Sequence, residues 1–242
     1  MPLNVISNRI IEPRRVMIYG PPNIGKTTFC ASAPKPLLID TEGGSNDMEV
    51  DRLQTESTWD GVMSSLRQVY QEVHDYKTLA IDTVDWVQTM IYQDLCAKHS
   101  KTSIADFGFG KGYEMAVDYW RKLWDACTAI RKKHGMTIIL SAHADIQKFQ
   151  RPDGDAFDFW APRMHKKAWH MLTEGCDEVL FANNRVRTRE DGNGKLKAVG
   201  AERMLWCTDK PTHIAKNRLG MPDTIDFSWS EYAKYIDGAN NE

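Results

Sequence analysis

The sequence predicts an α/β protein built on a doubly wound, mostly parallel β-sheet. Two observations lead to this fold class. Short apolar runs typical of buried strands alternate with longer stretches of helical periodicity, and a glycine-rich phosphate-binding motif directly follows the first run. Strands that alternate with helices form right-handed βαβ units. The 242 residues, 42% of them hydrophobic, are enough for one such domain and its core.

Five apolar runs are expected to form the parallel strands. Each is short and bounded by turn residues, which is typical of strands buried on both faces. They are VMIYG (16–20), PLLID (36–40), TLAID (78–82), MTIIL (136–140) and DEVLFA (177–182). Two amphipathic segments, 58–74 and 113–134, are long enough to serve as crossover helices, and the second ends in a basic turn that suits a helix carboxyl terminus.

The pattern changes after residue 183. Residues 185–200 are expected to form a C-terminal β-hairpin that turns at Asn193-Gly194. A short strand is expected over 213–218 and a small helix near 230–236. The chain therefore divides into an N-terminal arm (1–14), a single core domain (15–228), and a C-terminal helix and tail (229–242).

Composition and charge narrow the function classes. The net charge is −2, and Lys and Arg outnumber Asp and Glu by twelve to eight between residues 101 and 170, so any nucleic-acid surface must be local. No run approaches the roughly 18 apolar residues of a membrane helix, and the start lacks the apolar segment of a secretory signal, so no membrane partner is expected. The five cysteines form no CxxC pair, which favours a reducing cytoplasm over a disulfide framework or a zinc site.

The most specific motif is Gly20-Pro21-Pro22-Asn23-Ile24-Gly25-Lys26-Thr27, which fits G-x-x-x-x-G-K-[ST] at every fixed position. Its glycines let successive N–H groups point at a phosphate, and the helix that follows adds the positive end of its dipole. Lys26 is then expected to reach the β- and γ-phosphates, and the Thr27 hydroxyl to hold Mg²⁺. The sequence therefore predicts that Gly20 to Thr28 bind the phosphates of ATP.

Two acidic strand ends are expected to face this loop. Asp82 closes the run TLAID, where a Walker B aspartate would bind Mg²⁺ directly or through water. The run PLLID continues into Asp40-Thr41-Glu42, and a carboxylate there is placed to polarise the water that attacks the γ-phosphate. The alternatives are an ordinary strand-terminal aspartate and a solvated loop acid.

The order of the phosphate loop and the two acidic strand ends along the chain resembles that of the RecA/recombinase branch of P-loop ATPases, over about residues 15–225. A short chain with only a core resembles most the Sak-type single-strand annealing ATPases of bacteriophages. The resemblance implies a RecA-like core in which Glu42 is the catalytic glutamate and Asp82 the Walker B aspartate. It also implies that His143 senses the γ-phosphate, although the family usually has glutamine there.

The resemblance further implies an ATPase stimulated by single-stranded DNA, acting in annealing or recombination as a phage protein in the host cytoplasm. The expected partners are single-stranded DNA, further copies of the chain in a filament or ring, and a single-strand-binding protein. Lys216 and Arg218 resemble the basic pair that reaches the ATP of a neighbouring subunit. On a strand they would project to one face, and two exposed charges on an edge strand are the alternative.

The two DNA-binding loops of such proteins correspond to residues 106–115 and 145–167. The second mixes basic and aromatic residues, which suits phosphate contacts combined with base stacking, although its three aspartates count against a pure phosphate track. The alternative is a surface loop anchored by its aromatic residues, or a subunit contact. The glycines of the first equally suit a helix-entry turn. The DNA-contact candidates are Phe109, Lys111, Lys148, Phe149, Arg151, Arg163, Lys166 and Lys167.

Two other functions fit the same phosphate loop. One is a P-loop kinase or phosphotransferase for a small molecule, with residues 145–167 as its Arg-bearing lid. The other is a non-hydrolysing protein in which bound nucleotide locks an assembly. Phosphate release without an acceptor separates both from an ATPase.

Overall fold

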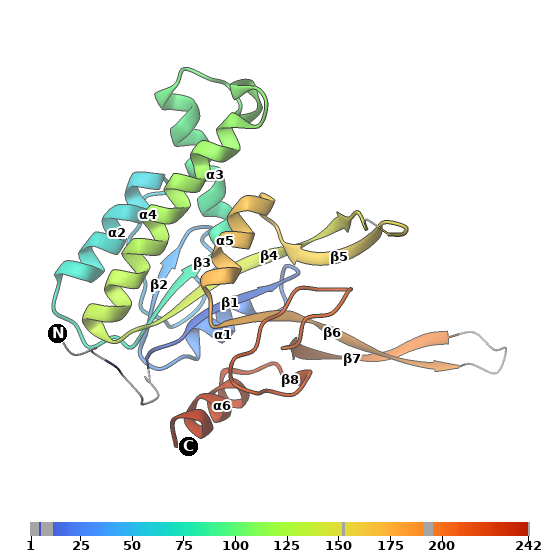
Figure 1. Ribbon diagram of the computed structural model, residues 1–242. Helices are drawn as coiled ribbons and strands as arrows, with labels where there is room; N and C mark the ends of the chain where they lie inside the picture. The colour runs from blue at the N-terminus through green and yellow to red at the C-terminus, as the bar shows by residue number, and fades with distance from the viewer. Residues whose placement is uncertain (1–4, 6–11, 152, 191–195, 242) are drawn as a thin grey trace.

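The computed structural model describes residue 5 and residues 12–151, 153–190 and 196–241. Within these residues the chain forms one mixed sheet of eight strands in the order β2-β3-β4-β1-β6-β7-β8, with β5 paired to the free end of β4 (Figure 1). The pairs among β2, β3, β4, β1 and β6 are parallel. The predicted fold class, an α/β core with a mostly parallel sheet, is confirmed.

The strands and helices have the following bounds. The strands are β1 (Arg15–Gly20), β2 (Pro36–Asp40), β3 (Thr78–Asp82), β4 (Thr137–Phe149), β5 (Phe157–Pro162), β6 (Glu178–Glu190), β7 (Leu196–Trp206) and β8 (Thr224–Asp226). The helices are α1 (Lys26–Ala31), α2 (Trp59–Gln71), α3 (Val84–Lys98), α4 (Lys111–His134), α5 (Lys166–Gly175) and α6 (Trp229–Asn241), with a 3₁₀ turn η1 (Ile104–Phe107) before α4.

Helices cover both faces of the sheet, as a doubly wound fold requires. Alternate residues of β1 point to opposite faces, so Met17 packs with α2, α3, α4 and α5, while Ile18 packs with α1 and α6. Figure 1 shows α1 and α6 on the opposite side of the sheet from α2 and α4. The parallel strands are buried on both faces, which is why they read as continuous apolar runs in the sequence.

Two strands are much longer than the apolar runs that predict them. β4 and β6 extend beyond the helix-covered sheet as antiparallel ribbons, β4 with β5 and β6 with β7 (Figure 1). The outer half of β4 holds only exposed and half-buried residues, so only its inner half gives an apolar run. The expected C-terminal hairpin is present as β6 and β7, and its predicted turn at Asn193-Gly194 lies outside the described residues.

Two local expectations are wrong. Residues 145–167 do not form a loop, because most of them belong to β4, β5 and the first turn of α5. The strand expected over 213–218 is absent from this described segment, which makes only isolated bridges at His213 and Lys216. Because it contacts β5 at one point and β6 at another, it never follows one strand long enough to form a ladder. In the described parts of the chain, no helix is long and apolar enough to cross a membrane.

Candidate nucleotide-binding site

The phosphate loop connects the carboxyl end of β1 to α1, as its sequence predicts. Gly25 precedes α1 with φ of 110°, a left-handed conformation that strains any residue with a Cβ. At Gly20 the constraint is space, because an added Cβ would lie 2.3 Å from the carbonyl oxygen of Ala182 on β6. Both glycines are therefore required by the backbone that forms the loop.

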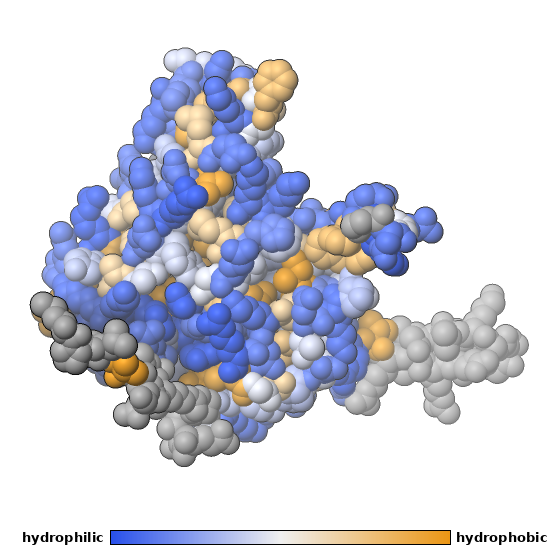
Figure 2. All heavy atoms as spheres, viewed as in Figure 1, coloured by the Kyte–Doolittle hydropathy of each residue, from blue (hydrophilic) through white to orange (hydrophobic). Residues whose placement is uncertain are grey.

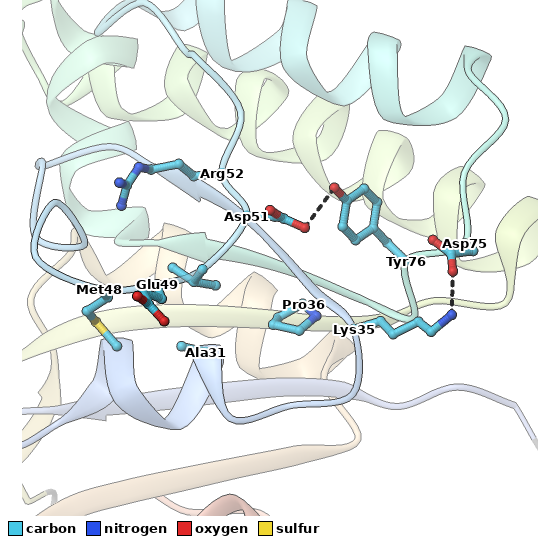
Figure 3. A pocket seen from close by; sticks show the side chains of 10 residues that line it. Ala31, Lys35, Pro36, Met48, Glu49, Asp51, Arg52, Asp75 and Tyr76 are labelled. Carbon is cyan, nitrogen blue, oxygen red and sulfur yellow. Dashed lines mark hydrogen bonds and ion pairs between the residues drawn. The ribbon is translucent and has the colours of Figure 1, made fainter.

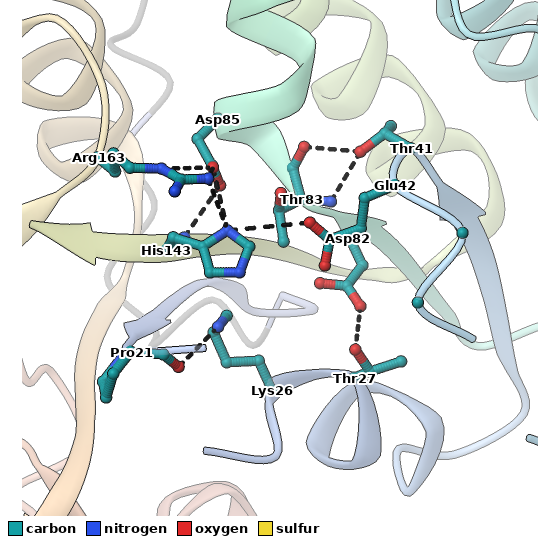
Figure 4. Close-up of polar contacts among 12 residues, drawn as sticks. Pro21, Lys26, Thr27, Thr41, Glu42, Asp82, Thr83, Asp85, His143 and Arg163 are labelled. Carbon is teal, nitrogen blue, oxygen red and sulfur yellow. Dashed lines mark hydrogen bonds and ion pairs between the residues drawn. The ribbon is translucent and has the colours of Figure 1, made fainter. Parts of the chain in front are cut away.

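Two groups hold this loop from opposite sides. The Lys26 ammonium donates to the carbonyl oxygens of Gly20 (3.2 Å) and Pro21 (3.1 Å), so the side chain folds back over the loop (Figure 4). Burial lowers the pKa of Lys26, and the nearby carboxylates of Asp82 and Glu42 oppose that shift. On the other side, Arg203 of β7 donates to the carbonyl oxygen of Ile24 at 3.3 Å. The C-terminal hairpin thus supports the loop directly.

Asp82 lies beside the loop at the carboxyl end of β3. Its Oδ2 accepts a hydrogen bond from the Thr27 hydroxyl at 2.6 Å (Figure 4). Its Oδ1 is buried without a partner among the described residues, as is the Ser141 hydroxyl on the neighbouring strand β4. An unpartnered carboxylate oxygen beside a hydroxyl offers the hard oxygen ligands that Mg²⁺ binds. The residues present therefore fit Mg²⁺ held jointly by Thr27, Asp82 and the phosphates of a nucleotide.

The ligands of that ion would not all come from the protein. The described residues contain no cluster of three or more His, Cys, Asp or Glu side chains able to hold a metal. Mg²⁺ characteristically keeps several waters and takes one or two carboxylates together with substrate phosphates. Thr27 and Asp82 beside the phosphate loop match this preference of Mg²⁺.

Glu42 follows β2 and faces the same site. The Thr41 hydroxyl accepts from the Thr83 N–H and donates to the Thr83 carbonyl oxygen, both at 2.8 Å, which fastens the loop after β2 to that after β3. The Glu42 side chain is 21% exposed, and its Oε2 lies 3.9 Å from Nδ1 of His143. Burial raises the pKa of Glu42; His143 opposes the shift, and Asp82 adds to it. A shielded carboxylate with a raised pKa is suited to accept a proton from water.

His143 lies on β4 next to Gly20, because the two residues are in register across β1 and β4. Its main-chain N–H donates to Oδ1 of Asp85 at 2.9 Å, and its Nδ1 lies 3.1 Å from Oδ2 of the same carboxylate. Arg163 donates to Asp85 through Nη2 at 2.6 Å and through Nε at 3.2 Å (Figure 4). Burial alone would raise the pKa of Asp85, but the hydrogen bonds from His143 and Arg163 hold it well below its usual range.

Sequence reasoning missed Asp85 and assigned Arg163 to DNA contact. An aspartate in the first turn of a helix is common for reasons of capping alone, so Asp85 carries no sequence signal of its own. Arg163 follows β5, and the structure places its guanidinium on Asp85 at the edge of the nucleotide site.

The other DNA-contact candidates lie on the β4–β5 ribbon and near the amino ends of α4 and α5. Lys148, Phe149 and Arg151 lie on or near the β4–β5 ribbon, and the Phe149 ring packs against Phe157 with ring centroids 5.3 Å apart. Apolar side chains gather on the surface at the base of this ribbon (Figure 2). The ribbon candidate Arg151 pairs with Asp153 at 3.1 Å.

The remaining candidates lie on helices. Phe109 precedes α4 and is fully exposed, in a left-handed conformation with φ of 47°. Lys111 begins α4 two residues later, after Gly110, so the segment forms the helix-entry turn that was the alternative to a DNA-binding loop. Lys166 and Lys167 begin α5, and Lys167 pairs with Glu114 of α4.

Lys216 and Arg218 lie at the opposite edge of the sheet from the phosphate loop. Lys216 bridges to Val179, near the amino end of β6, whereas the loop follows the carboxyl end of β1. The Lys216 ammonium donates to the carbonyl oxygens of Thr173, Glu174 and Cys176, at 3.2, 2.8 and 2.6 Å. Arg218 is half-exposed and pairs with Asp177 at 3.1 Å. Neither residue reaches the nucleotide site of its own chain.

Two hollows on the surface lie outside the phosphate loop. One lies beside Glu42 and is also lined by Thr55, Trp86 and Gln93. The other lies at the amino end of β2, where Tyr76 donates to Asp51 at 3.1 Å and Lys35 pairs with Asp75 (Figure 3). The second hollow holds paired surface charges and no group aimed at a phosphate.

The chain is similar to known proteins over most of its length. The AAA_24 family model, described as an AAA domain, matches residues 12–219. The chain is 24% identical over 221 residues to the SPbeta prophage-derived uncharacterized protein YorG of Bacillus subtilis (strain 168), covering 88% of this chain and 62% of that protein. It therefore spans less than two thirds of that relative. The crystal structure of the RadB recombinase aligns with a TM-score of 0.45 and 14% identity, over 79% of each chain.

Proposed function

We propose that the chain, which belongs to the AAA_24 family of AAA domains, hydrolyses ATP with Mg²⁺ under stimulation by single-stranded DNA. One observation carries the ATPase proposal: Lys26, Thr27 and Asp82 meet at one sheet edge around a buried carboxylate oxygen that lacks a partner in the described chain. Such a group costs free energy unless a ligand satisfies it.

The residues take distinct roles in this proposal. Lys26 exchanges its two carbonyl partners for phosphate oxygens, and the N–H groups of Gly20 to Thr28 bind the phosphates. Glu42 accepts a proton from the attacking water, and His143 donates a hydrogen bond to the γ-phosphate. When bound, Mg²⁺ supplies positive charge against the β- and γ-phosphate oxygens.

The direct test is phosphate release from ATP by the purified protein with no small-molecule acceptor present. We expect release that depends on Mg²⁺ and that Lys26→Ala abolishes. Phosphate transfer only in the presence of a small hydroxylated acceptor would instead favour the kinase. Tight ATP binding without release would favour the nucleotide-locked assembly.

Single-stranded DNA is proposed as the partner on chemical grounds. Exposed Phe149 and Phe109 offer ring faces on which bases of any sequence can stack, and Lys148, Lys166 and Lys167 offer cations for phosphates. A prophage-derived relative fits a role in phage annealing or recombination in the cytoplasm of a bacterial host, alongside a single-strand-binding protein.

The DNA proposal is tested by removing an aromatic ring on which a base would stack and measuring the affinity for single-stranded DNA. We expect Phe149→Ala to weaken single-stranded DNA binding by about 5- to 150-fold, the equivalent of 1–3 kcal/mol per stacked base. The matched control is Val73→Ala, which also removes an exposed apolar side chain but lies away from the ribbon. Equal affinity of both variants would exclude Phe149 from the DNA surface.

A homo-oligomer, as a filament or ring with ATP at subunit junctions, is proposed from the position of Lys216 and Arg218. Both lie at the edge of the chain away from its own phosphate loop, as residues acting on a neighbour's nucleotide would. Mixing a Glu42→Gln variant with a Lys216→Met, Arg218→Gln variant tests this. Mixed assemblies should regain hydrolysis, because the intact Glu42 of one subunit then meets the intact basic pair of the next. No recovery on mixing would place the pair outside the site.

A further inference from the structure

The order of the strands decides on which side of the phosphate loop a nucleoside can lie. β1 ends in the loop, with β4, β3 and β2 on one side of it in the sheet and β6, β7 and β8 on the other (Figure 1). The side chains proposed to act at the γ-phosphate, Glu42, Asp82 and His143, lie on or just after β2, β3 and β4. The groups that face the reacting phosphate therefore all come from the first side.

The direction of attack determines where the rest of the nucleotide lies. In phosphoryl transfer the attacking and leaving oxygens lie roughly in line, on opposite sides of the phosphorus. Glu42 is proposed to take a proton from the attacking water, so the leaving diphosphate and its nucleoside lie on the far side of the γ-phosphate from Glu42. The hollow beside Glu42, with its exposed Trp86, is on the side of the water and does not suit the base. The nucleoside is therefore expected toward β6, β7 and β8.

Two flat side chains lie against the phosphate loop on that side. A Cβ added to Gly25 would lie 3.0 Å from Cε1 of Phe227 and 3.1 Å from Nη1 of Arg203. The main chain joins these two residues, because the Phe227 N–H donates to the carbonyl oxygen of Arg203 at 3.2 Å. Phe227 is half-buried and Arg203 is exposed, so both keep surface that a ligand can cover.

The chemistry of both side chains suits a base. An aromatic ring has no donor for phosphate oxygens, but it stacks on the face of any nucleobase. A guanidinium is planar and also stacks on flat rings. Arg203 donates through Nη1 to the carbonyl oxygen of Ile24 at 3.3 Å, and that bond lies in the guanidinium plane, so it does not use the faces of the group.

We propose that Phe227 and Arg203 form the nucleobase end of the site, where the ring and the guanidinium stack on the base of the nucleotide whose phosphates the loop binds. The proposal rests on the nucleotide binding proposed above and names the residues that hold the base. Both residues belong to the C-terminal part of the sheet, since Arg203 lies on β7 and Phe227 directly follows β8.

The first test separates the base from the phosphates. ADP and inorganic pyrophosphate both offer two phosphates to the loop, and only ADP has a base. In calorimetric titrations with Mg²⁺ present, Phe227→Leu should weaken ADP binding about 5- to 150-fold and leave pyrophosphate affinity within about twofold of the parent value. The leucine keeps an apolar side chain beside Phe29, whose ring centroid lies 6.0 Å from that of Phe227. Equal weakening of both probes, or unchanged ADP affinity, would overturn the proposal.

Arg203→Lys is the second variant. Lysine keeps the charge and a donor but has no planar face, so ADP binding should weaken at least about threefold while pyrophosphate affinity stays within about twofold of the parent value. The matched control is Phe107→Leu, which changes another half-buried phenylalanine, in the 3₁₀ turn before α4. It should change neither affinity, and a loss of ADP affinity as large as that of Phe227→Leu would overturn the proposal.

The last test locates the base in the parent protein. An ADP analogue with an azide on its adenine attaches, on illumination, to the residues that the base contacts. Mass spectrometry should find the label on peptides that contain Arg203 or Phe227, and excess ADP should prevent the labelling. Label on Trp86 or elsewhere in place of these peptides would overturn the proposal. A protein that binds neither ADP nor pyrophosphate would overturn the whole nucleotide site, whereas labelling of Arg203 or Phe227 without ATP hydrolysis would support the base site and remove only the hydrolysis.

Discussion

The two edges of the parallel sheet both hold buried carboxylates, but they treat them differently. At the carboxyl edge of β1 and β3, Asp82 keeps one oxygen without a partner in the described residues, and its other oxygen is bonded only to a hydroxyl. Lys26 there is satisfied by carbonyl oxygens that a phosphate can replace. Polar groups at this edge therefore still lack the partners that a bound nucleotide would supply.

The amino edge of β1 and β6 is complete. Glu178 is fully buried, yet it pairs with Arg14 and accepts from the Tyr232 hydroxyl at 2.9 Å. Its neighbour Asp177 pairs with both Arg15 and Arg218. Charges at this edge therefore satisfy one another within the chain.

The difference separates residues that bind from residues that hold the fold. A buried polar group without a partner costs free energy, so it persists where a ligand completes it. A buried charge with partners contributes to the fold or roughly balances its own desolvation, and only its disruption is costly. Substitutions at the carboxyl edge should therefore change chemistry, and those of Asp177 and Glu178 at the amino edge should change stability.

The largest effect is expected from Glu42→Gln. Removing the group that accepts the proton of the attacking water should lower kcat by about 10²- to 10⁴-fold. ATP affinity and Tm should stay close to the parent values, because Glu42 makes no hydrogen bond that the fold depends on. The matched control is Glu49→Gln, an exposed glutamate seven positions along the chain. A Glu42 variant that hydrolyses ATP at the parental rate would remove this residue from the site.

Glu178→Ala should reverse that pattern. It leaves Arg14 and the Tyr232 hydroxyl without their carboxylate, so the free energy of unfolding should fall by roughly 3 kcal/mol. Hydrolysis per folded molecule should be unchanged. Urea unfolding followed by tryptophan fluorescence measures the first quantity, with exposed Glu174→Ala as the control. Loss of hydrolysis without loss of stability would contradict the division between the two edges.

Lowering the pH of one protein should affect hydrolysis at the carboxyl edge and stability at the amino edge at different pH values. Glu42 works only as the carboxylate, and its pKa is raised by burial, so hydrolysis is lost as pH falls through a value above the ordinary glutamate range of about 4.3. Burial would raise the pKa of Asp177, but hydrogen bonds from Arg15 hold it below its ordinary range. The stability that Asp177 contributes is therefore present above about pH 3.9 and is lost as pH falls through its lower folded-state pKa.

Falling pH should thus produce a folded, inactive protein before it unfolds the chain. Phosphate release and near-ultraviolet circular dichroism, recorded on the same samples, give the two midpoints. Coincident midpoints would mean that loss of hydrolysis reports unfolding rather than protonation of Glu42.

The sequence reveals the two edges to different degrees. The phosphate loop is predictable because its chemistry requires fixed residues at fixed spacing, and Asp82 because it closes a strand buried on both faces. The contacts among Asp85, His143 and Arg163 are not predictable, because they join three elements through the register of the sheet and a ribbon that the sequence presents as a loop.

The contacts at the amino edge cannot be predicted from the sequence for a similar reason. Lys216 stands in a segment with no continuous ladder, so alternation along a strand says nothing about its contacts. Its partners are main-chain carbonyl oxygens at the end of α5, and a carbonyl group has no sequence signature.

The smallest effect is expected from Lys216→Met, which tests this residue most closely. The methionine keeps an apolar stem but loses the donors to three carbonyl oxygens at the end of α5, so the free energy of unfolding should fall by about 1 kcal/mol. The control is Lys234→Met, which removes an exposed pair with Glu231 of little expected value. In the oligomer proposed above, Lys216→Met also lowers hydrolysis, whereas a loss of stability with hydrolysis unchanged would mean that the ammonium serves only α5 of its own chain.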